Sequence, residues 1–319
     1  MRINNILNPE DISGNYTALM TPMKNGGGLI NPIDYDKLFM LIEDQINSGV
    51  RGFVVAGTTA QSSTLSRNEH VDLVTNTFSH IRKKFGKAIG LIVGAGSNCT
   101  LEALTLSMEI ENAVGPTTFL HVTGYYNNPP QEGLIIHFEK LASASPDSNL
   151  MLYNVPSRTN SKLEIESIKY LSRNENIVGI KDASGDLNFV KEIINNTNKN
   201  EFVVLSGEDN IVSNVMKLGG RGVISASANV APRYFVNITN AALSSKFDIA
   251  DTLQKEVNPL VSAVFYRKNP IPLAHMFNTN VRLPLVRLPP IEEHLKTILS
   301  RYSKENLGID LLKYNNSHK

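Results

Sequence analysis

Eight short apolar runs recur along the chain, and their number and spacing limit the possible folds more than any other feature. The runs begin near residues 16, 52, 88, 117, 150, 177, 203 and 222. Each interval is long enough for a strand, a helix and two loops. Runs such as Phe53-Val54-Val55-Ala56 are apolar throughout, which is typical of parallel strands covered on both faces. Eight such units predict an α/β fold, the (β/α)8 TIM barrel, because eight strands close the sheet.

The segments between these runs have the apolar spacing of helices. Residues 33–48 form one such segment, which ends before Gly49. Ser66-Arg67-Asn68-Glu69 predicts a capping box at the start of another helix. From residue 231 the strand pattern stops and helical patterns continue. We therefore expect a barrel with a short N-terminal extension over 1–230 and a mostly helical C-terminal region over 231–319. The polar tail after Leu312 is expected to be frayed.

Composition excludes several classes of protein. The 31 Lys+Arg and 30 Asp+Glu residues leave a net charge of +1, so the basic surface of a nucleic-acid-binding protein is missing. No apolar stretch approaches the roughly 18 residues of a membrane span, and the N-terminus lacks the apolar core of a signal peptide. The single cysteine, Cys99, cannot form an intrachain disulfide. These features predict a cytoplasmic protein that binds neither nucleic acid nor membrane.

The sequence shows no pattern typical of a bound cofactor. Its seven histidines lack metal-ligand spacing, and a single cysteine cannot supply a thiolate cluster. Residues 94–99 imitate a dinucleotide-binding loop but lack its third glycine. Glu208 and Asp209 follow the seventh strand, where a barrel often binds phosphate, and two acids disfavour a phosphate there. We expect no metal ion, nucleotide or flavin.

Functional groups of such barrels follow the carboxyl ends of the strands, and Lys181 stands out there. The buried run Ile177–Ile180 leads directly into it. Burial disfavours the ammonium form and makes the neutral amine available as a nucleophile. The alternative is a structural lysine that pairs with Asp182 or Glu208.

Three other strand ends carry polar groups. Tyr153 offers a phenol that can donate and accept a proton; the alternative is an ordinary aromatic at the barrel mouth. Arg158 offers a forked donor suited to a carboxylate, with a surface ion pair as the alternative. Gly57-Thr58-Thr59 can present N–H groups and hydroxyls to an anion, or it is an ordinary turn.

Taken together, the strand-end motifs resemble the dihydrodipicolinate synthase / N-acetylneuraminate lyase family of barrels. The resemblance covers nearly the whole chain. Its most specific motifs are Gly57–Thr59, Val122–Asn127, Tyr153–Thr159, Ile177–Ala183, Leu205–Asp209, Gly219–Ser225 and Asn269–Pro272. Sialic-acid lyases of the family usually carry Gly-Ser-Thr at 57–59 and lack an arginine at the place of Arg158. The chain is therefore more similar to the synthases.

The resemblance implies a Schiff-base lyase that condenses pyruvate with L-aspartate 4-semialdehyde and needs no cofactor. Lys181 would form the imine with pyruvate, and Arg158 would hold the carboxylate of the semialdehyde. Tyr126, which comes from the adjacent subunit in this family, implies at least a dimer, and the usual form is a homotetramer. The full set implied is Lys181, Tyr153, Thr58 and Tyr126 for catalysis and Thr59, Arg158, Gly207 and Ile224 for substrate binding.

One departure bears on the substrate site. The family's usual Gly-Glu after the two threonines is Ala60-Gln61 here. Alanine removes the freedom to adopt a positive φ, and glutamine removes a charge while it keeps its hydrogen-bonding groups. We expect this pair to alter substrate affinity.

A second cluster suggests regulation by L-lysine. Lysine-inhibited members of the family bind lysine at a dimer interface, and the resemblance assigns that site to Arg67, His70, Asn98, Glu102 and Tyr125. Arg67 departs from the family's usual histidine. The expectation is weakened inhibition, and the alternative is a solvated interface without a ligand.

Two other functions remain open from the sequence. One is another pyruvate-dependent aldolase of the family, either an N-acetylneuraminate lyase or a 2-keto-3-deoxy sugar acid aldolase. Such an enzyme keeps Lys181 and Tyr153 without needing Arg158 as a clamp. The other is a catalytically silent sensor of small molecules, for which Ala60-Gln61 would be a sign of drift.

Overall fold

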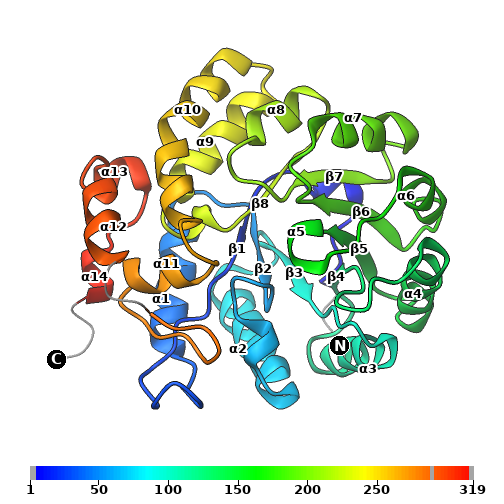
Figure 1. Ribbon diagram of the computed structural model, residues 1–319, viewed down its shortest axis with the longest axis horizontal. Coiled ribbons are helices and arrows are strands. Elements are labelled where there is room, and N and C mark those ends of the chain that lie inside the picture. The colour runs from blue at the N-terminus through cyan, green and yellow to red at the C-terminus, as the bar shows by residue number, and fades with distance from the viewer. Residues whose placement is uncertain (1–4, 288–290, 316–319) are drawn as a thin grey trace.

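Eight parallel strands close into a barrel in the computed structural model, which describes residues 5–287 and 291–315 (Figure 1). Each strand pairs with the next one in the chain, and the last pairs with the first, with Gly14 opposite Gly222. The strands are β1 (Gly14–Ala18), β2 (Gly52–Val55), β3 (Gly90–Gly94), β4 (Thr118–Val122), β5 (Asn149–Asn154), β6 (Ile177–Asp182), β7 (Val203–Ser206) and β8 (Gly222–Ser225). The predicted TIM barrel is confirmed, and each strand begins within two residues of its predicted start.

The barrel is buried on both faces, as its continuous apolar runs predict. All residues of β2 and β3 are buried. Side chains that fill the interior include Tyr16, Ile92 and Met151, and a larger apolar layer separates the strands from the helices. This packing leaves the strand ends as the places where polar side chains meet a cavity.

Helices alternate with the strands and surround the barrel (Figure 1). The surrounding helices are α1 (Tyr35–Asn47), α2 (Arg67–Phe85), α3 (Thr100–Val114), α4 (Gln131–Ala144), α6 (Ile165–Leu171), α7 (Leu187–Asn196), α8 (Val212–Lys217) and α9 (Pro232–Leu243), and short α5 (Pro156–Thr159) follows β5 directly. Short 3-10 turns span Pro9–Asp11, Ser62–Thr64 and Ser227–Asn229. The predicted capping box begins α2: the Ser66 side chain accepts from Glu69 N, and Glu69 accepts from Ser66 N.

Beyond α9 the described chain is helical, as predicted. The elements are α10 (Phe247–Val264), α11 (Ile271–Met276), α12 (Ile291–Leu299), α13 (Lys304–Leu307) and α14 (Leu312–Asn315). Because α9 contacts β1 and β8, it covers the seam where the barrel closes. The domain boundary at residue 230 stays a prediction. In the described ranges no helix combines the length and the apolarity that crossing a membrane requires.

The expectation of a frayed tail over residues 313–319 is wrong for residues 313–315, and residues 316–319 lie outside the described residues. Tyr314 is fully buried, and its hydroxyl donates a hydrogen bond to Asp44 at 3.1 Å. Its ring packs edge-on against Phe277. The tyrosine thus docks the last described helix onto α1, a contact across 270 residues that the local polarity does not reveal.

Two buried histidines lie between the sheet and the helices, outside the barrel mouth. The Nε2 atom of His121 on β4 lies 3.3 Å from the Ser107 hydroxyl, and the Nδ1 atom of His137 lies 2.8 Å from the Thr100 hydroxyl. Burial lowers the pKa of His121 to about 3, and the neighbouring His137 adds to the effect. Both imidazoles are therefore neutral in the folded protein.

We predict that this burial makes stability depend on pH. The folded-state pKa of His121 lies below its ordinary value of 6.5. Its contribution to the free energy of unfolding is therefore fully present above pH 6.5. That contribution is lost as the pH falls from 6.5 towards 3, by up to about 1.4 kcal/mol per pH unit. Urea unfolding of the wild type and His121→Gln between about pH 7 and 5, above the range in which most carboxyls titrate, should show a shallower dependence for the variant. Parallel curves would contradict the assignment.

Candidate active site

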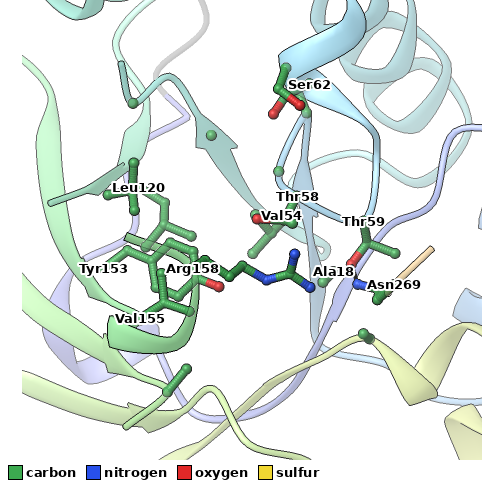
Figure 2. A pocket seen from close by; sticks show the side chains of 18 of the residues that line it. Ala18, Val54, Thr58, Thr59, Ser62, Leu120, Tyr153, Val155, Arg158 and Asn269 are labelled. Atoms are coloured by element: carbon green, nitrogen blue, oxygen red, sulfur yellow. Dashed lines mark hydrogen bonds between the residues drawn. The ribbon is translucent and has the colours of Figure 1, made fainter. Parts of the chain in front are cut away.

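A cavity of about 990 Å³ opens at the carboxyl ends of the strands. Its walls come from loops and ends of all eight strands, β1 to β8, and from residues 265–269, which join α10 to α11. Figure 2 shows Tyr153 and Val155 on one side of this space and Thr58 and Thr59 on the other. The cavity lies where the barrel geometry predicts a functional site.

Lys181 and Tyr153 form the centre of this site. They lie opposite each other in the register of β5 and β6, and the Lys181 ammonium nitrogen is 4.3 Å from the centroid of the Tyr153 ring. Lys181 is 7% exposed. Its neighbour Asp182 points to the other face of the strand and accepts hydrogen bonds from Asn154 and Ser184. Lys181 therefore points into the cavity, and Asp182 has partners of its own.

Gly207, after β7, leaves the space that the Lys181 side chain occupies. A Cβ atom at this position would lie 3.0 Å from the Lys181 Cε and 2.7 Å from the Ala183 Cβ. Its backbone N–H donates to the Asp182 carbonyl at 2.6 Å, which holds the loop close to β6. Gly207 therefore contributes to the site by leaving room for the Lys181 side chain.

The loop after β2 forms the opposite wall. Thr58 and Thr59 line the cavity, and the Thr59 hydroxyl accepts a hydrogen bond from the Asn269 side chain at 2.8 Å. Asn269 is buried and thereby ties residues 265–269 to the barrel mouth. The sequence motif at 269–272 included this residue but suggested no role for it.

The structure accounts for the Ala60-Gln61 pair. The positive φ of this turn lies at Gln61 (φ 60°) and not at Ala60, so alanine has no unfavourable backbone to adopt. The side-chain oxygen of Gln61, Oε1, accepts a hydrogen bond from the Arg282 backbone N–H at 2.9 Å. The neutral side chain is therefore used in a buried contact that fixes the loop. The expected effect on substrate affinity stays a prediction.

Arg158 extends into the cavity from α5. Figure 2 shows its side chain crossing from the side of Tyr153 towards Thr59 and Asn269. On the far wall, Ile224 of β8 lines the cavity and is 1% exposed. The guanidinium thus faces the space between the two walls, where a carboxylate can reach it.

Glu208 is a further acidic group in this cavity, for which the sequence suggested two roles: disfavouring phosphate and pairing with Lys181. It follows Gly207 and lines the cavity. Burial and the neighbouring Asp209 raise its pKa to about 6, whereas Lys181 and Arg158 act in the opposite direction. The site therefore holds one acid near two cations.

Four of the five predicted effector residues line the same cavity. Arg67, His70, Glu102 and Tyr125 line it, and the Asn98 side chain accepts from the Tyr125 backbone N–H at 2.8 Å. Arg67 forms an ion pair with Glu109 at 2.6 Å. His70 is buried, which lowers its pKa, and its Nε2 atom lies 2.8 Å from the Gly94 carbonyl oxygen.

Tyr126 is the one predicted catalytic residue that does not line the cavity. It is 94% exposed and has a φ of 72°. Within a single chain its phenol is therefore separated from Lys181 and Tyr153.

No group of three or more His, Cys, Asp or Glu side chains suited to a metal ion occurs among residues 5–287 and 291–315.

We predict that Gly207→Ala slows imine formation by the Lys181 amine strongly and lowers the stability of the fold only slightly. The added methyl needs a shift of Ala183 or Lys181, a change of the kind that costs about 1–3 kcal/mol in a packed site. Reductive trapping of a 2-oxo acid should slow strongly, while the melting temperature falls by a few degrees. Gly133→Ala on α4, where the backbone has no positive φ and the nearest atom would lie 3.6 Å from the added Cβ, controls for the loss of a glycine. Wild-type trapping by Gly207→Ala would contradict this role.

Comparison with known proteins agrees with this geometry. The model of the dihydrodipicolinate synthetase family matches residues 11–302. The 4-hydroxy-tetrahydrodipicolinate synthase of Methanococcus aeolicus is 39% identical over 91% of this chain and 99% of its own, and that of Methanocaldococcus jannaschii is 39% identical over 93% and 99%.

Solved structures agree over the same length. The chloride-inhibited dihydrodipicolinate synthase from Acinetobacter baumannii, in complex with pyruvate, superposes with a TM-score of 0.84 at 35% identity and covers 94% of this chain and 100% of its own. The enzyme from Cyanidioschyzon merolae with lysine bound gives 0.84 at 30% identity over 91% and 98%. The barrel, the cavity and the full-length likeness together place this chain in the dihydrodipicolinate synthetase family.

Proposed function

We propose that this chain is a Schiff-base-forming lyase that condenses pyruvate with L-aspartate 4-semialdehyde to 4-hydroxy-tetrahydrodipicolinate, a step of lysine biosynthesis. One observation carries the mechanism: the buried Lys181 amine lies 4.3 Å from the Tyr153 ring centroid inside the cavity. Full-length relatives with the name of this synthase support the choice of reaction. The proposal includes a cytoplasmic location, which the single cysteine favours.

The first half of the reaction makes a carbon nucleophile from pyruvate. The neutral Lys181 amine attacks the ketone carbon, and the oxygen leaves as water after it has been protonated. The protonated imine then withdraws electrons from the methyl group, which loses a proton and becomes an enamine. The ring of Tyr153 lies 4.3 Å from this amine, and its phenol serves as the group that gives and accepts these protons.

The second half joins the two substrates. The enamine carbon attacks the aldehyde carbon, whose oxygen takes up a proton. The substrate's ammonium group then loses a proton to water, and the free amine attacks the imine carbon, closes the ring and releases Lys181. Arg158 holds the carboxylate of the semialdehyde, and Thr58 and Thr59 hold that of pyruvate. Such a clamp supplies the orientation that forming a carbon–carbon bond requires.

Completion of this site needs a second copy of the chain. Tyr126 is 94% exposed, and a phenol in that position can reach the cavity of a neighbouring subunit rather than its own. We assign it the proton relay with Thr58, in a homotetramer built from dimers. The exposed Leu101 and Tyr125 near the same end of the cavity fit such an interface.

The reaction is tested by reducing the enzyme–pyruvate imine with borohydride and measuring the intact mass. The wild type should gain one adduct, located on Lys181, and Lys181→Ala should gain none. Arg158→Ala is the matched control, because it should keep the adduct while it raises the Michaelis constant for the semialdehyde, as the loss of a charge-assisted contact of about 1.5–3 kcal/mol implies. A wild type without an adduct would support the silent sensor instead.

L-lysine is the effector that fits the second cluster. Glu102 offers a carboxylate to an ammonium group, and Tyr125 and Asn98 offer polar groups beside it. The Arg67–Glu109 ion pair compensates much of the charge of Arg67, which reduces its repulsion of a lysine side chain. Lysine therefore binds here more weakly than at a site without that arginine.

We predict partial inhibition by L-lysine that weakens in Glu102→Ala. Calorimetric titration should show binding in the wild type and a loss of about tenfold in the variant, the typical effect of a lost charge-assisted hydrogen bond. Glu132→Ala, on α4 outside the cavity lining, provides the control. Absence of binding at millimolar lysine would remove this site.

A further inference from the structure

Glu208 lines the substrate cavity and has no role in the proposed mechanism. It lies in the loop after β7, whereas Lys181 lies in β6 and Arg158 in α5, the short helix after β5. The three groups therefore come from consecutive β/α units, and all three line the cavity. The charges of Lys181 and Arg158 both act on the Glu208 carboxyl.

The loop that carries Glu208 is held on both sides. The Ser206 hydroxyl accepts from the Glu208 N–H at 3.2 Å and donates to its carbonyl at 2.8 Å. Asp209 is 1% exposed and accepts from the Ser227 N–H at 2.7 Å. Its carbonyl accepts from Gln254 at 2.9 Å. These bonds fix the backbone on either side of Glu208, so its side chain is presented to the cavity from a defined position.

A carboxylate at this place works against binding of pyruvate. Pyruvate is an anion, and an acid near Lys181 repels it and is itself disfavoured by partial burial. A cationic group of the second substrate offsets both effects. L-aspartate 4-semialdehyde carries an ammonium group and a carboxylate on the same carbon, and a cavity lined by both Glu208 and Arg158 offers an oppositely charged partner to each group.

We propose that Glu208 binds the ammonium group of the second substrate and thereby selects an amino-acid aldehyde over aldehydes that lack the amine. This inference rests on the proposed function, because it assumes that the semialdehyde enters the cavity after pyruvate. Three points of attachment then hold the substrate: its aldehyde carbon at the enamine, its carboxylate at Arg158 and its ammonium at Glu208. Three points are enough to distinguish the L from the D enantiomer.

Succinic semialdehyde tests the proposal, because it is the same molecule without the amino group. For the pyruvate-loaded enzyme, we would measure kcat/KM for L-aspartate 4-semialdehyde and the inhibition constant of succinic semialdehyde. Glu208→Gln should lower the first by about ten- to a hundredfold, the effect of losing a hydrogen bond between charged groups. The second should stay unchanged or improve. Glu208→Asp keeps the charge and should recover part of the loss.

Two controls separate the causes of a negative result. Glu201→Gln makes the same change at an exposed position before β7 and should leave both constants unchanged. Borohydride trapping of pyruvate in each variant reports whether Lys181 still reacts. Equal losses for both aldehydes, or an unchanged kcat/KM in Glu208→Gln, would overturn the role of Glu208 while trapping by the wild type leaves the proposed function intact. Failure of the wild type to form the adduct would instead overturn the proposed function.

Discussion

The register between β5 and β6 is the constraint on which the site depends. It places Tyr153 opposite Lys181, with both side chains inside the barrel mouth. A shift of one residue would turn Lys181 towards the helices and bring Asp182 inward, because side chains alternate along a strand. Asn154 and Ser184 hold Asp182 on the outer face. Hydrogen bonds on the far side of the sheet thus help to keep the amine in the cavity.

The helical C-terminal region helps to hold the catalytic loops. Asn269 bonds to Thr59, and the backbone of Arg282 bonds to Gln61. The Arg282 guanidinium, 4% exposed, contacts both carboxylate oxygens of Glu69, at 2.6 and 2.9 Å, and lowers the pKa of that acid to about 2. Because Glu69 belongs to the capping box of α2, one buried arginine joins the loop after β2, the start of α2 and the C-terminal region.

Local patterns were enough to predict the strands, the capping box at Ser66 and the placement of Lys181 at a strand end. The same patterns left open whether Lys181 pairs with Asp182 or Glu208, because pairing depends on strand register and on the other partners of each acid. Contacts such as Asn269 with Thr59 or Tyr314 with Asp44 join residues more than 200 positions apart. No periodicity or spacing carries that information. The role that we propose for Glu208 could not be predicted from the sequence for a similar reason. It depends on Lys181 and Arg158, which the fold brings to the same cavity.

The loop between β4 and α4 links the two ligand sites that we propose. Asn98 accepts from the backbone N–H of Tyr125, and the next residue is Tyr126, the phenol assigned to a neighbouring active site. We propose that an effector bound between Glu102 and Tyr125 acts on the backbone that carries Tyr126. Because Tyr126 has a left-handed conformation, with a φ of 72°, which is uncommon for a bulky residue, its position depends on the bonds around it. Under this proposal, inhibition by lysine needs no change in the barrel. A shift of this loop that moves the Tyr126 phenol relative to the partner subunit is enough.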